Sequence, residues 1–338
     1  SEIGDKIRMD VKHFQKVITD FEHSGCDYTA DDVIAEFSSN NPENFLFPFM
    51  EGVIANLKTL GKIRTSETYA ATLCSFRRFR EDKDVTLDDM DSDMMMAYEA
   101  YLKNNGVSPN SSSFYMRNLR AVYNRAVEKE LTPQRFPFKH VYTGVDKTVK
   151  RAVPLKVIKR IKEMDFSMNP SFDFARDMFL MSFYTRGMSF VDMAYLRKKD
   201  LQNGVLSYRR RKTGQQLFIK WEKCMQEIVD KYDTSQSNYL LPIIKPFGDI
   251  DERTQYIYAA HNINRCLKII GKELGLSVSL TLYVARHAWA SIAKSKNVPL
   301  SVISEGMGHD SEATTRIYLA SLDTVAIDKA NSMILKSL

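Results

Sequence analysis

Apolar residues recur at helical spacing through most of this chain, and one segment between residues 203 and 221 departs from that spacing. An Asn-Gly pair at 203–204 is followed by the run VLSYRRR, a turn with the letters KTG at 212–214, and the run QQLFIKW. Two runs rich in β-branched and aromatic residues around a glycine-containing turn are typical of an antiparallel hairpin. The sequence therefore predicts a mainly α-helical fold with one small antiparallel β-sheet.

A loss of periodicity after residue 130 divides the chain. Residues 41–130 consist of helical stretches, whereas residues 131–154 hold three prolines and five basic residues, as interdomain linkers often do. Because the chain begins with Ser rather than Met, we expect its first residues to be the remnant of a longer or processed region. The predicted parts are an acidic N-terminal extension (1–40), a helical domain (41–135), a linker (136–154), and a mixed α+β domain (155–338) ending in a tail (321–338).

Composition narrows the class of protein. No run approaches eighteen apolar residues, so we expect no membrane span, and the N-terminus lacks the apolar stretch of a signal peptide. The four cysteines lie far apart without a Cys-x-x-Cys pair, which argues against a zinc site and a disulfide framework. We therefore expect a cytoplasmic protein with no bound metal and no membrane partner.

Charge is distributed unevenly along the chain. Residues 1–40 carry four basic and nine acidic residues, whereas residues 101–160 carry thirteen basic and three acidic ones. Such a basic block is typical of a surface that binds a polyanion, and it is equally typical of a solvated helix face followed by a charged linker. Arg and Asn on one helix side can also bond base edges and phosphates. The candidate DNA-binding residues are Arg117, Asn118, Arg120, Asn124, Arg125, Lys147, Lys150 and Arg151.

Four segments of the second half carry polar residues that a core does not require. They are YTRGMSFVDMAYL (184–196), SYRRRKTG (207–214), LTLYVARHAWASIAK (280–294) and GMGHDSEATTRIYLASL (306–322). Each alone is weak evidence, since a single His beside Arg is more often structural and a single Tyr on a helix usually packs. Their order and spacing together are the informative feature.

In that order the segments resemble the boxes of the tyrosine recombinase (phage integrase) family, over roughly residues 41–338. ARHAWAS resembles its Arg-His box, with Arg286 as the second arginine, and GMGH resembles its Leu-Gly-His box, with His309 in the third basic position. ATTRIYL matches the box of the nucleophile, Tyr318, and the hairpin KTG matches the strand-borne lysine, Lys212. The resemblance implies a helical core-binding (SAM-like) domain followed by a mixed α+β catalytic domain.

The chain departs from the family pattern at two positions. Ser189 stands where the first arginine belongs, three residues before Asp192, and Arg186 lies three residues upstream at the usual threonine. Tyr283 replaces the first histidine of the Arg-His box. These variants resemble the integrases of bacterial conjugative transposons and related mobile elements.

The resemblance implies a site-specific DNA recombinase that cleaves and rejoins DNA through a covalent 3′-phosphotyrosine at Tyr318, without metal, ATP or any cofactor. Arginine forks would stabilise the negative charge on phosphorus, and Lys212 would protonate the leaving 5′-oxygen. His309 and Tyr283 would act as neutral hydrogen-bond donors to the phosphate oxygens.

Two candidates can supply the missing arginine fork. Arg186 is close in sequence to the vacant position. Arg210 lies two residues before Lys212, so strand alternation is expected to place both side chains on one face of the hairpin. The sequence does not choose between them.

The expected partners are double-stranded DNA, further copies of the chain (a tetramer on DNA, a monomer when free), and accessory DNA-bending proteins. The tail after residue 321 carries apolar residues that suit docking into a neighbouring subunit, although packing on its own domain is the alternative. Two other functions stay open. One is a type IB topoisomerase-like nicking-closing enzyme, and the other is a DNA-binding regulator with weakened catalysis.

The basic block yields a first prediction. Replacing Arg117, Arg120 and Arg125 with Ala should weaken DNA binding and flatten its salt dependence, because fewer counterions are released, while the chemistry at a bound site is unchanged. Fluorescence anisotropy on a labelled duplex at several salt concentrations measures both quantities. Unaltered nonspecific affinity would show that the block is only a solvated face.

Overall fold

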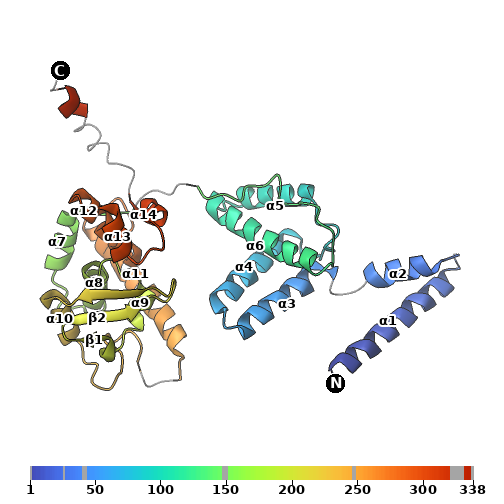
Figure 1. Ribbon diagram of the computed structural model, residues 1–338, viewed down its shortest axis with the longest axis horizontal. Coiled ribbons are helices and arrows are strands. Elements are labelled where there is room, and N and C mark those ends of the chain that lie inside the picture. The colour runs from blue at the N-terminus through green and yellow to red at the C-terminus, as the bar shows by residue number, and fades with distance from the viewer. Residues whose placement is uncertain are drawn as a thin grey trace. The chain divides into compact units, whose positions relative to one another are not determined.

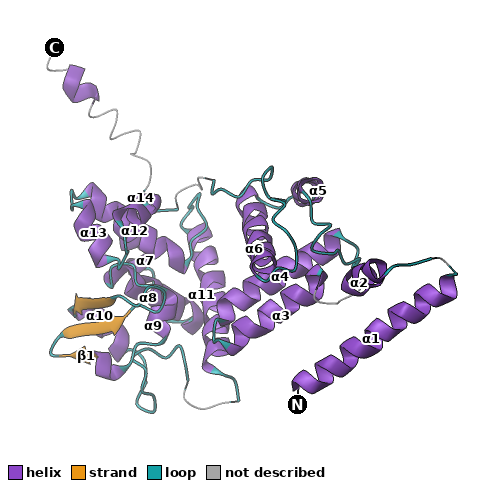
Figure 2. Ribbon diagram, turned by 45° about the vertical axis from the view of Figure 1, so that its right-hand side comes forward, coloured by secondary structure: helices purple, strands orange, loops and turns teal. Residues whose placement is uncertain are grey.

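The computed structural model divides the chain into two compact units, residues 1–147 and 148–338, which are considered separately (Figures 1 and 2). No helix in the described part of the chain is long and apolar enough to cross a membrane. The structure describes residues 2–25, 27–39, 44–146, 151–245, 249–319 and 331–335.

The first unit is helical. Capping signals fix several of its helix ends: the Asp91 carboxylate accepts from the Met94 amide at 2.8 Å, and Ser108 caps the helix that opens with Pro109. Its helices are α1 (Glu2–Ser24), α2 (Ala30–Ser39), α3 (Leu46–Thr59), α4 (Ile63–Phe79), α5 (Ser92–Asn104) and α6 (Pro109–Glu128).

Helix α6 is the central helix of this unit and contacts α3, α4 and α5. It buries an apolar stripe at helical spacing, which includes Met116, Leu119 and Tyr123. The chain that follows α6 adds Phe138 and Val141 to the same core. The basic residues of α6 therefore lie on a helix whose opposite side is fixed by packing.

The second unit combines helices with a three-stranded antiparallel sheet in the order β1-β2-β3, which confirms the predicted fold class. Asn203 and Gly204, with φ of 51° and 72°, form the two-residue turn between β1 and β2, as this turn type requires. Its elements are α7 (Leu155–Glu163), α8 (Pro170–Tyr184), α9 (Phe190–Ala194), a 3₁₀ turn η2 (Lys198–Asp200), β1 (Leu201–Gln202), β2 (Val205–Arg209), β3 (Gln216–Lys220), α10 (Lys223–Asp230), α11 (Glu252–Glu273), α12 (Leu282–Ser295), α13 (Leu300–Gly306) and α14 (Glu312–Tyr318).

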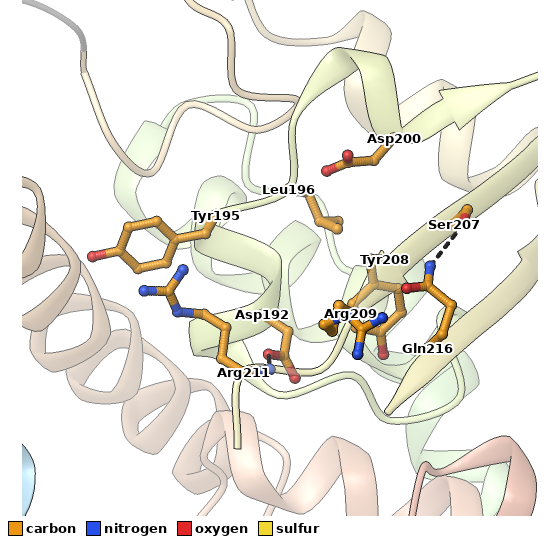
Figure 3. A pocket seen from close by; sticks show the side chains of 9 residues that line it. All are labelled: Asp192, Tyr195, Leu196, Asp200, Ser207, Tyr208, Arg209, Arg211 and Gln216. Carbon is orange, nitrogen blue, oxygen red and sulfur yellow. Dashed lines mark hydrogen bonds between the residues drawn. The ribbon is translucent and has the colours of Figure 1, made fainter. Parts of the chain in front are cut away.

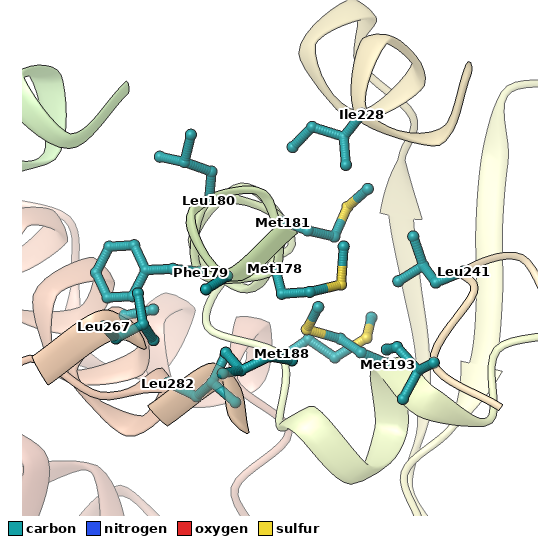
Figure 4. Packing of buried hydrophobic residues seen from close by; sticks show 14 of the residues in the cluster. Met178, Phe179, Leu180, Met181, Met188, Met193, Ile228, Leu241, Leu267 and Leu282 are labelled. Carbon is teal, nitrogen blue, oxygen red and sulfur yellow. The ribbon is translucent and has the colours of Figure 1, made fainter. Parts of the chain in front are cut away.

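Helix α8 lies in the core of this unit and contacts α7, α10, α11 and α12. Figure 4 shows it end-on, with Met178, Phe179, Leu180 and Met181 pointing outward on several sides. A helix that is apolar on so many sides must be enclosed by other elements. Because α8 is held in this way, the turn that follows it has a fixed position.

Candidate active site

Arg286 lies in the first part of α12 and is only 5% exposed. Its Nη1 donates to the Gly187 carbonyl at 2.5 Å, and its Nη2 donates to the Met307 carbonyl at 2.8 Å and to His309 Nε2 at 2.9 Å. These partners are neutral, so the contacts satisfy donors of the guanidinium without cancelling its positive charge. The side chain also joins the turn after α8 to the loop between α13 and α14.

His309 is buried in that loop, and both its ring nitrogens have partners. Nε2 faces Arg286, and Nδ1 lies 2.8 Å from Thr315 Oγ1. Burial, together with the positive charges of Arg286, Arg210 and Lys212, lowers the pKa of His309 to about 4. The imidazole is therefore neutral at pH 7.

Arg210 and Lys212 lie in the hairpin turn, and the prediction that strand alternation aligns them is wrong. Strand β2 ends at Arg209, and the Arg210 amide donates to the Gln215 carbonyl at 2.8 Å, which closes the turn. Arg210 is buried and donates through Nη1 to the carbonyl of Gly308, whereas Lys212 is exposed. Both cations nevertheless act on His309, as its lowered pKa shows.

Arg186 belongs to the turn after α8, where it and Gly187 have φ of 61° and 73°. The Gly187 amide donates to the Ser182 carbonyl at 2.8 Å and closes this turn. The half-buried side chain of Arg186 runs beside α13, because a Cβ added to Gly306 would lie 3.6 Å from its Cδ. The turn thus directs Arg186 toward the same loop that Arg286 and Arg210 contact.

Three arginines of this unit influence the pKa of one buried phenol, Tyr208. Tyr208 lies on β2 and is buried, and burial with the Asp192 carboxylate raises the pKa of its hydroxyl. The positive charges of Arg286, Arg210 and Arg186 oppose that rise. All three guanidinium groups therefore lie close enough to influence a single phenol.

Ser189, at the position of the family's first arginine, caps the short helix α9. Its hydroxyl donates to an Asp192 carboxylate oxygen at 2.6 Å, and the other oxygen accepts from the Arg211 amide at 2.9 Å. Figure 3 shows Asp192 beside the hairpin and Arg211 turned to the ring of Tyr195, with its guanidinium carbon 3.9 Å from the ring centroid. Asp192, Tyr195 and Arg211 are among the residues that line a small polar pocket of about 270 Å³. Ser189 and Asp192 hold the hairpin in place.

Tyr283 and Tyr318 are the remaining candidates from the sequence. Tyr283 is half exposed, and its ring packs edge-on against His287 with centroids 4.6 Å apart. Tyr318 is the last residue of α14, a helix that contacts α12 and α13. Its side chain lies outside the described part of the structure, as does most of the tail after it.

The DNA-binding candidates on α6 have partners within their own unit. The Asn118 amide donates to Thr72 Oγ1 at 2.8 Å and so links α6 to α4. The Asn124 carbonyl oxygen accepts from the Gln134 side chain at 3.3 Å. Asn118 is half-buried at this helix contact, whereas Asn124 is exposed.

The three arginines of α6 differ in exposure and in their contacts. Arg120 is exposed and donates to Thr143 Oγ1 at 3.3 Å, and Arg125 lies over the Tyr69 ring. Arg117 is half-buried. Of the basic residues that follow, Arg151 is exposed, and Lys147 and Lys150 lie outside the described residues.

Two residues of the cluster were not singled out from the sequence. Gly187 stands in the turn after α8, and Thr315 stands three residues before Tyr318. A glycine followed by a polar helix cap was the available signal for the first, and a hydroxyl inside the nucleophile box was the signal for the second. Nowhere in the described ranges do three His, Cys, Asp or Glu side chains gather in a way that could hold a metal ion.

Two profiles of known protein families match this chain. The profile of the phage integrase SAM-like domain matches residues 45–141, and that of the phage integrase family matches residues 155–324. No curated protein sequence matches the chain.

Similar solved structures include a lambda integrase dimer bound to a COC′ core site (TM-score 0.63, 16% identity, covering 88% of this chain and 83% of that chain). A lambda integrase tetramer bound to a Holliday junction is similar (TM-score 0.62, 16% identity, 88% and 82%). So is the Tn1549 transposon integrase in complex with a circular intermediate DNA (TM-score 0.58, 15% identity, 84% and 99%). At these identities the structures show a shared fold.

A SAM-like helical domain followed by an integrase domain defines the class of protein as the tyrosine recombinases. Because the second profile matches half of the chain, this chain belongs to the phage integrase family.

The close approach of Gly187 to Arg286 yields a second prediction. A Cβ at residue 187 would lie 2.8 Å from the Arg286 Cα, and the positive φ adds about 1–2 kcal/mol of strain. Gly204→Ala is the matched control, since its φ is similar and nothing lies within 4 Å. Gly187→Ala should therefore lower the free energy of unfolding more than Gly204→Ala does.

Tryptophan fluorescence during urea denaturation measures this difference in the second unit, because both tryptophans of the chain, Trp221 and Trp289, belong to it. Equal losses for the two variants would contradict the contact with Arg286.

Proposed function

We propose that this chain is a site-specific recombinase that cleaves and rejoins duplex DNA through a covalent 3′-phosphotyrosine at Tyr318. The proposal rests on one observation above all. Arg286, Arg210 and His309 share a buried cluster next to α14, the helix that ends at Tyr318. Membership of the phage integrase family agrees with this chemistry.

In the proposed reaction, the Tyr318 oxygen attacks a backbone phosphorus and the bond from phosphorus to the 5′-oxygen breaks. The phenol loses its proton to water, and Lys212 supplies a proton to the 5′-oxygen. An ordinary phenol has a pKa near 10, so nearby cations are needed to favour its ionised form. Rejoining is the reverse reaction with a 5′-hydroxyl as the nucleophile.

Arg286 is the proposed main ligand of the phosphate. Its present acceptors are carbonyls and an imidazole, and a phosphate oxygen carries more negative charge than any of them. The low exposure of Arg286 strengthens that attraction, because water does not screen it. His309, being neutral, would contribute a hydrogen bond rather than a charge, and Tyr283 is a further neutral donor at the exposed edge.

Arg210 is the proposed replacement for the first arginine, with Arg186 as the second candidate. Arg210 is buried and bonds the carbonyl of Gly308, which directly precedes His309. It also lies on the same hairpin turn as Lys212. Arg186 approaches from the turn after α8 and influences the same phenol, Tyr208.

The proposed partner is double-stranded DNA, bound by the arginines of α6 together with Lys147, Lys150 and Arg151. The lambda and Tn1549 integrases of similar fold were solved with DNA, the former as a dimer and as a tetramer. We extend this to a tetramer on DNA, with a monomer when free and accessory DNA-bending proteins as additional partners. Ser189, which supplies a helix cap instead of a charge, favours a second candidate, a DNA-binding regulator with weakened catalysis.

The nucleophile yields a third prediction. Tyr318→Phe should bind DNA like the wild type but form no covalent adduct, since the attacking oxygen is absent. A nicked suicide duplex with a label, incubated in EDTA and resolved by denaturing electrophoresis, detects the adduct. An adduct on the Phe variant would contradict the assignment, and absence of an adduct on the wild type would favour the regulator.

The replaced arginine yields a fourth prediction. Arg210→Ala should slow single-turnover cleavage by about 10²–10³, the usual effect of removing one donor to a developing oxyanion. Arg186→Ala should slow it less, and Arg209→Ala, an exposed neighbour on the same hairpin, is the matched control.

Adding the substitution Ser189→Arg to the Arg210→Ala variant tests whether arginines at the two positions bind the same phosphate. Recovery of the cleavage rate would show that they do. Wild-type rates for both Arg210→Ala and Arg186→Ala would contradict a relocated arginine and leave Arg286 alone on the phosphate.

A further inference from the structure

Thr315 joins the helix of the proposed nucleophile to the histidine of the cluster. Its side chain is fully buried on α14, and Oγ1 lies 2.8 Å from His309 Nδ1. It lies three positions before Tyr318, so the two positions are neighbours on one side of the helix.

The partners of His309 determine where its proton lies. A guanidinium donates hydrogen bonds and accepts none, so Nε2 must accept from Arg286. The neutral ring then carries its proton on Nδ1 and donates it to Thr315 Oγ1. In this arrangement Nε2 cannot donate to a phosphate oxygen.

Simple protonation does not provide the missing donor. The ring is buried, and the charged groups that face it are Arg286 from α12 and Arg210 and Lys212 from the hairpin turn. Burial, and then the positive charges of these three cations, lower the pKa of His309 to about 4. At neutral pH, a donor at Nε2 therefore requires the other neutral tautomer, whose Nδ1 must accept a hydrogen bond.

We propose that Thr315 is a positioning residue that supports both neutral tautomers of His309 and so allows Nε2 to change from an acceptor for Arg286 into a donor for the substrate phosphate. When the phosphate takes over the Arg286 donor, one proton leaves Nδ1 for water and one arrives from water at Nε2. The Thr315 hydroxyl then rotates and donates to Nδ1. The net charge of the ring is unchanged. This inference rests on the proposed function.

The test compares two substitutions of one residue in single-turnover cleavage of the nicked suicide duplex. Thr315→Val keeps the shape but removes the hydroxyl, and we expect cleavage to slow by about tenfold to a hundredfold, as when one buried polar group loses its partner. Thr315→Ser keeps the hydroxyl and should restore most of the rate. Thr314→Val, on the adjacent residue of α14, is the matched control and should cleave normally.

A double-mutant cycle separates this role from mere packing. In a His309→Ala background, Thr315→Val should cause no further loss, because the group through which it acts is gone. An equal loss in both backgrounds would overturn the inference, as would a Thr315→Ser variant as slow as Thr315→Val. DNA affinity, measured by anisotropy, should be the same for all variants.

The same experiment distinguishes a failure of the proposed function from a failure of the role proposed for Thr315. A wild-type protein that forms no covalent adduct contradicts the proposed function. A wild-type protein that forms the adduct, together with a Thr315→Val variant that cleaves at the same rate, overturns only the role of Thr315.

Discussion

The arrangement of the second unit depends on the hydrogen bonds made by one buried group, the guanidinium of Arg286. Burying a cation is costly unless hydrogen bonds replace its water, and here the bonds come from two carbonyls and an imidazole in separate segments. The segments are held together because they share this one group. The partners in these hydrogen bonds are neutral, so the bonds themselves do not cancel the positive charge of the guanidinium.

The backbone around this group is adapted to it. Gly187 permits a close approach that a Cβ would prevent, and the rigid helix α8 fixes where that glycine lies. On the far side, Asp192 accepts from the Arg211 amide and anchors the hairpin that carries Arg210. Arginines from three separate elements, Arg286, Arg210 and Arg186, thus approach the same part of the unit. The favourable packing of the whole unit offsets the electrostatic repulsion among these positive charges.

Much of this could be predicted from the sequence, since local signals were strong. The glycine-containing turn at 212–214 predicted the hairpin of β2 and β3, and the order of the boxes singled out Arg286 and His309, which the structure joins at 2.9 Å. The prediction was weakest where the contacts of a side chain come from residues far away in the sequence. The alternation of side chains along a strand does not apply to Arg210, because β2 ends at Arg209 and the Arg210 amide donates to the Gln215 carbonyl within the turn. The bond from the Asn118 amide to Thr72, on another helix, likewise has no signal in the local sequence.

The hairpin turn has one further consequence. It carries Arg210 and Lys212 only two residues apart, and it is fastened to the rest of the unit through Asp192 and the carbonyl of Gly308. Under the proposed roles, charge for the phosphate and a proton for the leaving oxygen arrive on the same short loop. Displacement of this one loop would therefore remove both groups from the cluster at once.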